Sequence, residues 1–299
     1  MGIFWRKLPA VASRENSGLA GLCIEAFRRL FADEAVPLAG NIAFRTVFSI
    51  FPFLIFLTTL AGFFGNAELA EKLVNWLLSV APANIITPIA PEIRSILTVP
   101  RTGLLSISAA LTIWSAMGGV DSLRVGLNRA YDIRETRNFY WLYLQSILFI
   151  IGAAFVLLAL AVLIVLAPVM ISFMRVHAPG LRGLSDAFDS LRLPLAIALL
   201  MTGLTATHKI LPARRPAFRD IWPGVVLTML VWIALSLIYS RWLSDFSTFA
   251  STYSGLSGVF AAMFFLYLAA LVFIFGGEVN RVLAARRNGL GQSDDPPLD

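Results

Sequence analysis

The sequence has too few charged, thiol and imidazole groups for a soluble enzyme or a metalloprotein. Charged residues make up only 14% of the 299 positions, whereas soluble domains usually carry about 25%. The single cysteine, Cys23, excludes an intrachain disulfide. The two histidines, His177 and His208, have no cysteine near them, so no zinc site is expected. Because there is also no phosphate-binding glycine loop and no nucleophile elbow, we predict no catalytic residues, no metal and no cofactor, and the protein is not expected to be an enzyme.

Long apolar stretches dominate the chain instead. Hydrophobic residues make up 58% of the sequence, and the mean hydropathy is +0.78. A helix needs roughly 20 mostly apolar residues to cross a bilayer. Six stretches approach or exceed that length, at Thr46–Phe64, Gly103–Gly119, Phe139–Phe173, Leu193–Thr207, Ile221–Ser240 and Val259–Gly277. The predicted fold class is all-α: a polytopic membrane protein with six transmembrane helices plus short amphipathic interfacial helices.

The segments outside these stretches are too short to form a separate soluble domain. We expect a flexible N-terminus at 1–17, one six-helix transmembrane domain at 18–287, and a disordered tail, rich in Gly, Asp and Pro, at 288–299. Apolar residues recur at helical spacing in Leu19–Phe31, which predicts an amphipathic helix. That helix could lie on the membrane surface or pack on the ends of the bundle. A second amphipathic segment at 69–80 predicts short helices on the outer rim.

The basic residues are distributed unevenly between the two sets of loops. The formal net charge is +6. If the N-terminus is inside, sixteen Lys and Arg residues lie in inner segments, seven lie in outer loops, and Arg45 lies at the start of the first span. Because Lys and Arg collect on the cytoplasmic side of membrane proteins, the sequence predicts that both termini are cytoplasmic. The positive charge therefore requires no nucleic-acid partner.

Polar residues at the inner end of the first span are the first candidates for function. Asn41 and Arg45 are four residues apart and so share one helical face. Arg45 could extend to the lipid headgroups, or it could face the bundle and pair with Asp121 or Glu278. Polar groups within a span are costly in hydrocarbon and are often functional. Pro52 interrupts the same span, either as a tolerated kink or as a functional break.

The segment Val120–Arg137 is expected to form a separate helix after the second span, with one polar and one apolar face. It is either a solvated inner helix or a surface that contacts lipid headgroups. At the end of the sixth span, Glu278 could instead pair with Arg281, three residues on. The candidates on the polar face of the Val120–Arg137 segment include Asp121, Arg124, Asn128 and Arg129.

Four sequence blocks occur in an order that is typical of one family. They are AGNIAFRTVFSIFPFLIFL at 39–57, WSAMGGVDSLRVGLNRAYDI at 114–133, FRDIWPGVVLTMLVWIALS at 218–236 and STYSGLSGVFAAMFFLYLAALVFIFGGEVN at 251–280. With these blocks the chain resembles the YihY/BrkB-type bacterial inner-membrane proteins, once labelled ribonuclease BN. Arg45 departs from the resemblance, since that position is usually aromatic or apolar, and so does Ser254, where glycine is usual. The residues that match the family's motifs are Ser49, Phe51, Pro52, Asn128, Arg129, Tyr131, Asp220, Pro223, Gly224, Tyr253, Gly258, Gly277, Glu278 and Asn280.

The resemblance implies a protein of the bacterial inner membrane whose partners are membrane lipids and, as a second class, other envelope proteins. Our leading hypothesis is a transporter or transport helper for a lipid or an amphipathic solute in envelope biogenesis. The alternatives are a non-transporting envelope scaffold that binds partner proteins, and a solute or ion exporter. The old nuclease label has no support in the residues, since the sequence has no metal-binding carboxylate cluster and no nucleic-acid module.

The leading hypothesis makes a structural prediction. A protein that handles lipid should have a cavity that opens sideways to the bilayer, lined by Asn41, Arg45, Asp121 and Glu278. A tightly closed bundle with Arg45 directed at the headgroups would contradict it.

Overall fold

The computed structural model describes residues 18–64, 102–177, 182–250 and 256–287, together with isolated positions between 68 and 95 and at 180. Residues 1–17, residues 288–299 and Tyr253, for which the sequence made predictions, lie outside the described residues. So does most of the predicted amphipathic segment at 69–80 on the outer rim. The described helices are α1 (Leu19–Ala32), α2 (Ala35–Phe64), α5 (Thr102–Ala130), α6 (Phe139–Ala161), the π-helical turn η1 (Val162–Leu166), α7 (Ala167–His177), α8 (Arg182–Ile210), α9 (Phe218–Ala250) and α10 (Leu256–Arg287).

Six of these helical segments are long and apolar enough to cross a membrane, which confirms the six predicted spans. Most are longer than the apolar stretches. In particular, α2 begins at Ala35 and α10 continues to Arg287, so the polar residues at their ends are part of the helices. A helix satisfies its own backbone hydrogen bonds, and for this reason apolar chain crosses hydrocarbon in that form.

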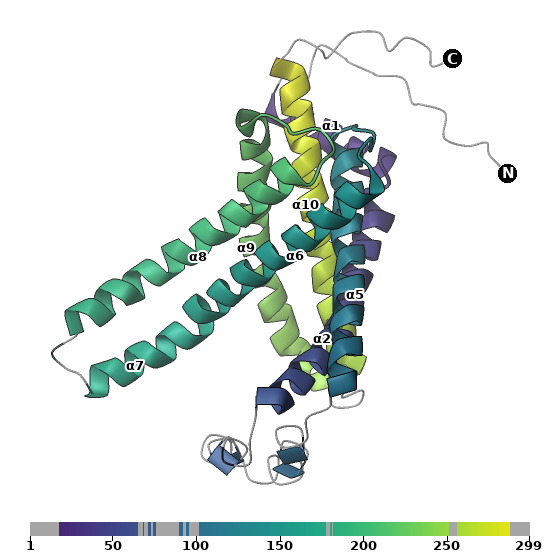
Figure 1. Ribbon diagram of the computed structural model, residues 1–299. Coiled ribbons are helices and arrows are strands. Elements are labelled where there is room, and N and C mark those ends of the chain that lie inside the picture. Colours follow the sequence, from purple (N-terminus) through teal and green to yellow (C-terminus); the bar gives the residue numbers. More distant parts are fainter. Residues whose placement is uncertain are drawn as a thin grey trace.

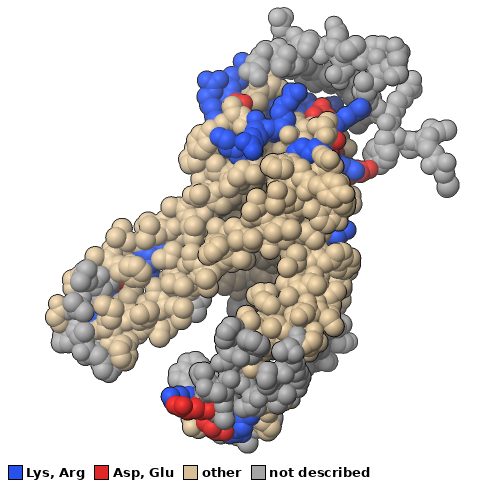
Figure 2. Space-filling model, viewed as in Figure 1, with Lys and Arg blue, Asp and Glu red and all other residues tan. Residues whose placement is uncertain are grey.

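The helices are arranged as a bundle and an arm (Figure 1). In the bundle, α2 packs along α5, and α10 packs on both α9 and α2. The arm is a long hairpin, in which α6, η1 and α7 run outward and α8 returns. It meets the bundle through contacts of α6 with α5 and of α8 with α9. Away from these contacts the arm diverges from the bundle, and Figure 2 shows open space between the two.

One end of the molecule carries most of the basic side chains (Figure 2). We call it the basic end; it holds α1, the segments 131–138 and 211–217, and the last turns of α10. The predicted separate helix at Val120–Arg137 is wrong: α5 continues unbroken to Ala130, and the chain then turns through residues 131–138. The fourth span is also longer than its apolar stretch, since α8 begins at Arg182.

Helix α1 packs on the bundle, which is one of the two alternatives that the sequence left open. Its buried residues Leu22, Ala26 and Leu30 lie on one face, and Leu22 and Ala26 pack with Val279 and Val282 of α10. The opposite face leaves large apolar side chains exposed, namely Ile24, Phe27 and Phe31. The helix is therefore docked on the bundle and also presents an apolar face outward.

Helices α9 and α10 cross at very short range. A β-carbon added to Gly224 would lie 2.0 Å from the carbonyl oxygen of Gly276, and one added to Gly276 would lie 2.2 Å from Oγ1 of Thr228. Small residues allow membrane helices to approach this closely. The crossing fixes the position of the end of α10, which carries Glu278 and Asn280.

Candidate functional site

The polar candidates from the sequence fall into two groups that do not meet. Asn41, Arg45, Asp121 and Arg124 line a cavity between α2, α5 and the start of α6. Asn128, Tyr131, Glu278 and Asn280 lie nearer the basic end and do not line that cavity. The prediction that Glu278 shares a cavity with Arg45 is therefore wrong.

The cavity between α2, α5 and α6, which we call the lateral cavity, has a volume of about 610 Å³. That is within the range of small-molecule sites, about 300–1,000 Å³. Several of its wall residues are aromatic and have exposed fractions of 44% to 64%, so the cavity is open at the side of the bundle. These aromatic residues are Phe44, Phe48, Trp114, Phe139 and Tyr143.

Arg45 reaches from α2 across to the backbone of α5. Its Nε donates a hydrogen bond to Oδ1 of Asn41 at 3.2 Å, and Nδ2 of Asn41 donates to Oγ of Ser122 at 3.1 Å. Its guanidinium lies over Gly118, where a β-carbon would be only 2.2 Å from Nη1. Neither ion pair expected for Arg45 is present in the described chain, because Asp121 pairs with Arg124 and Glu278 has no partner.

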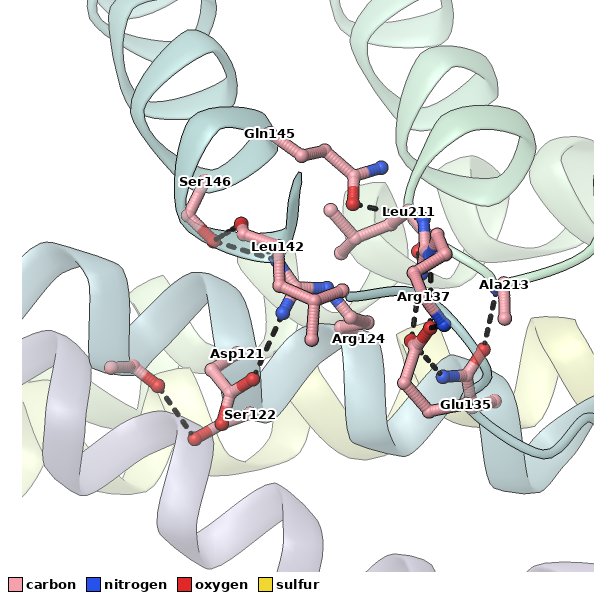
Figure 3. Close-up of polar contacts among 12 residues, drawn as sticks. Asp121, Ser122, Arg124, Glu135, Arg137, Leu142, Gln145, Ser146, Leu211 and Ala213 are labelled. Atoms are coloured by element: carbon pink, nitrogen blue, oxygen red, sulfur yellow. Dashed lines mark hydrogen bonds and ion pairs between the residues drawn. The ribbon is translucent and has the colours of Figure 1, made fainter. Parts of the chain in front are cut away.

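Arg124 is the second cation of the lateral cavity, and it is held rigidly. Its side chain is only 4% exposed. It donates to Oδ1 of Asp121 at 3.0 Å, to the carbonyl oxygen of Leu142 at 3.1 Å and to Oγ of Ser146 at 2.6 Å (Figure 3). These bonds join α5 to the first turns of α6. Since Asp121 offsets the charge of Arg124, Arg45 is the cation that remains unneutralised in the cavity.

A second set of hydrogen bonds holds the arm at the basic end (Figure 3). Arg137 donates to Oε2 of Glu135 at 2.8 Å, to Oε1 of Gln145 at 2.9 Å and to the carbonyl oxygen of Leu211 at 2.8 Å. Nδ2 of Asn128 donates to Glu135 at 3.0 Å. The hydrogen bonds from Arg137, opposed by partial burial, lower the pKa of Glu135 to about 2. This set of contacts ties the ends of α5, α6 and α8 together.

The other group of candidates forms a buried chain of hydrogen bonds. The backbone N–H of Gly224 donates to Oδ1 of Asn280 at 2.6 Å, and Nδ2 of Asn280 donates to the Tyr131 hydroxyl at 3.0 Å. That hydroxyl lies 2.8 Å from Nδ1 of His208. Because the tyrosine oxygen accepts from Asn280, its own proton is available for the histidine. Burial raises the pKa of Tyr131 above its ordinary value, so the hydroxyl keeps that proton.

Glu278 lies beside this chain but makes no hydrogen bond to it. The residue is fully buried, and neither carboxyl oxygen has a hydrogen-bond partner in the described chain. The alternative in which Glu278 pairs with Arg281 is wrong, because Arg281 binds Asp33 at 3.4 Å and Asp132 at 2.8 Å. A carboxyl group without a hydrogen-bond partner is costly to bury.

The remaining candidates lie apart from both groups. The Ser49 hydroxyl donates to the carbonyl oxygen of Thr46 within α2 at 2.7 Å, Pro52 lies inside the same helix, and Arg129 pairs with Glu34. His208, which is fully buried, was not among the predicted site residues. Neither was Gly118, although the two adjacent glycines Gly118 and Gly119 in the second span indicated a close approach.

The comparisons with known proteins agree with this architecture. A family model described as "Virulence factor BrkB" matches residues 26–297. YfkH of Bacillus subtilis (strain 168), named as a ribonuclease-like protein, is 29% identical over 267 residues, which are 88% of this chain and 95% of YfkH. The UPF0761 membrane protein VV0203 of Vibrio vulnificus (strain YJ016) is 19% identical over 259 residues, which are 84% of this chain and 78% of VV0203. No solved structure matches the chain.

These matches confirm the resemblance drawn from the four sequence blocks. The family is one of membrane proteins and is not a known enzyme class. The word ribonuclease in the name of YfkH describes that protein. Among the described residues, no three or more His, Cys, Asp or Glu side chains are grouped as a metal ion would require. The chain is a membrane protein of the virulence factor BrkB family.

Proposed function

We propose that the protein is a transporter, or a transport helper, for a lipid or an amphipathic solute in envelope biogenesis. The observation that supports this proposal is the lateral cavity, which joins an unneutralised arginine to an apolar aromatic wall at the side of the bundle. An amphipathic ligand has a matching charged group and apolar body. Such a ligand could enter from the bilayer without crossing water.

The proposal includes a location and an orientation. We place the protein in the bacterial inner membrane with its basic end, and therefore both termini, in the cytoplasm. The support is the gathering of Lys and Arg at that end (Figure 2), as is typical of cytoplasmic loops. The lateral cavity would then open toward the inner leaflet, since Asp121, Arg124 and Phe139 are close to the basic ends of their helices.

The scaffold alternative receives less support from the same residues. A scaffold would contact other proteins through its rim helices, at 68–80, and its inner loops, at 120–137. Much of the segment 120–137 is engaged within the protein. Its polar side chains Arg124, Asn128 and Arg137 bind α6 or the chain after α8. An ion or solute exporter remains the other alternative, and the flux experiment below distinguishes it.

The test is reconstitution of the full chain into vesicles. We would compare the transbilayer movement of a fluorescent anionic lipid and the efflux of trapped small solutes for the parent, Arg45→Glu and the control Arg215→Glu. Arg215 is exposed and lies outside the lateral cavity. We expect lipid movement above that of protein-free vesicles in the parent and in Arg215→Glu, and a clear reduction in Arg45→Glu.

Two results would count against the proposal. Background flux of both lipid and solutes in the parent would remove transport as the function. Solute efflux without lipid movement would favour the exporter. A further check is cross-linking from the 120–137 segment, where stable protein adducts in place of lipid adducts would favour the scaffold.

A further inference from the structure

Resting on the proposed function, we infer that Arg45 and Gly118 form a seat for the phosphate of an anionic phospholipid, whose acyl chains lie against the aromatic wall of the lateral cavity. Binding of a lipid at this seat can be present or absent independently of its flux across the bilayer.

Arg45 has hydrogen-bond donors that are available to a ligand. A guanidinium has five N–H donors. Asn41 accepts from Nε only, and the Nη1 and Nη2 groups have no hydrogen-bond acceptor within the part of the chain that the structure describes. These nitrogens present a planar pair of donors, the arrangement that binds phosphate oxygens in two-point contacts.

Gly118 decides where that donor pair lies. Because glycine has no side chain, the arginine head lies directly against α5, in space that a β-carbon would occupy. The head is held from the other side by Asn41, which is itself anchored to Ser122 of α5. Arg45 is exposed, and its head is directed over the cavity by this hydrogen bond and by the open space at Gly118.

The charge of the cavity and the position of Arg45 within a span favour a lipid as the source of the phosphate. Asp121 already offsets Arg124, so the cavity has one cation in excess and suits a ligand with one negative charge. Arg45 lies ten residues into α2, about 15 Å along the helix from Ala35. Arg45 lies within the candidate span Ala35–Leu60. An uncompensated guanidinium within a span is costly, and a headgroup phosphate drawn toward it would compensate the charge.

The walls provide for the rest of such a lipid. Phe48 and Trp114 lie on α2 and α5, farther from the basic end than Arg45 and Gly118 respectively, and both line the cavity. They are 48% and 64% exposed, and so offer apolar surface that faces the bilayer. A phospholipid with its phosphate at Arg45 would have its chains beside these rings.

The experiment measures lipid contact at Trp114. The full chain is placed in nanodiscs of phosphatidylcholine that contain the same small fraction of either brominated phosphatidylglycerol or brominated phosphatidylcholine. Bromine quenches nearby tryptophan, and the Trp114 signal is the difference between each protein and its Trp114→Phe form. The variants are Arg45→Gln and Gly118→Ala, with Gly119→Ala as matched control, since a β-carbon there meets nothing within 4 Å.

We expect the parent and Gly119→Ala to show an enrichment of the anionic lipid of about fivefold over phosphatidylcholine, the factor that corresponds to ~1 kcal/mol for one basic side chain near a membrane surface. Arg45→Gln should reduce this enrichment to about one. Gly118→Ala should reduce it substantially, because the methyl group displaces the flexible arginine head while the charge is kept. If Gly118→Ala does not fold, the enrichment measured for Arg45→Gln alone tests the phosphate seat.

Three outcomes would overturn the inference. They are equal quenching by the two lipids in the parent, an undiminished enrichment in Arg45→Gln, and loss of the enrichment when inorganic phosphate, but not chloride of the same ionic strength, is added. The last result would assign the seat to a free anion. Anionic enrichment without lipid flux would refute the proposed function alone, whereas lipid flux without enrichment would refute only the phosphate seat.

Discussion

The crossing of α9 and α10 gives the sharpest prediction about stability. Replacing Gly224 by alanine puts a β-carbon 2.0 Å from the carbonyl oxygen of Gly276 and 2.6 Å from Cγ of Asn280. The carbonyl belongs to the backbone of α10, so the clash is relieved only if the helix moves. The substitution also disturbs the hydrogen bond from the Gly224 N–H to Asn280.

The expected size of the effect follows from three contributions. Overpacking a close contact costs typically 1–3 kcal/mol, and a weakened hydrogen bond costs about 1 kcal/mol. Alanine gains about 1 kcal/mol over glycine in a helix interior. The net expectation for Gly224→Ala is therefore a destabilisation of about 1–3 kcal/mol.

The assay is thermal unfolding of the purified protein in detergent, followed by size-exclusion chromatography of the fraction that stays folded. Gly152→Ala is the matched control, because Gly152 lies inside α6 and a β-carbon there meets nothing within 4 Å. We expect the control to melt at or above the temperature of the parent and Gly224→Ala to melt below it. A Gly224→Ala protein as stable as the control would show that α9 and α10 do not cross as described.

Two further predictions concern the basic end. Glu135 has its pKa lowered from 4.5 to about 2, so its stabilising contribution is present above pH 4.5 and is lost as the pH falls toward 2; Glu135→Gln should lose less stability over that range, and an unchanged pH dependence would contradict the pairing. Tyr131→Phe leaves the buried polar atoms of His208 and Asn280 without their partner, at a cost of about 2–4 kcal/mol. The exposed Tyr140 supplies its control, since Tyr140→Phe should leave the melting temperature unchanged.

Some features of the candidate site were within reach of sequence reasoning. The four-residue spacing of Asn41 and Arg45 predicted a shared face, and the structure joins the two side chains by a hydrogen bond. Asp121 was correctly expected to lie near Arg45, because both line the lateral cavity. The predicted ion pair between Asp121 and Arg45 was wrong. Asp121 pairs instead with Arg124, which lies three residues along α5 and therefore on the same face of the helix.

Other features depend on residues that are far apart in the sequence. Nothing in the sequence around His208 indicates that Tyr131 will lie 2.8 Å from it, or that the packing of several helices will exclude solvent from the ring. Glu278 has an arginine three residues away, yet that arginine turns to Asp33 and Asp132. Which partner each of these side chains contacts depends on how the helices cross. The crossing depends in turn on small residues such as Gly224 and Gly276.

The all-helical fold, the six spans and the basic end can all be inferred from the sequence alone. The hydropathy and length of a span, and the charge of a loop, are read from consecutive residues. The bilayer selects for these local properties whatever the packing between helices. Three features become apparent only in the folded chain: α6 to α8 diverge from the bundle as an arm, Arg45 lies against Gly118 beside an open cavity, and Glu278 is buried away from that cavity. These are relations between helix faces in three dimensions, and they are fixed by how closely the backbones can approach one another.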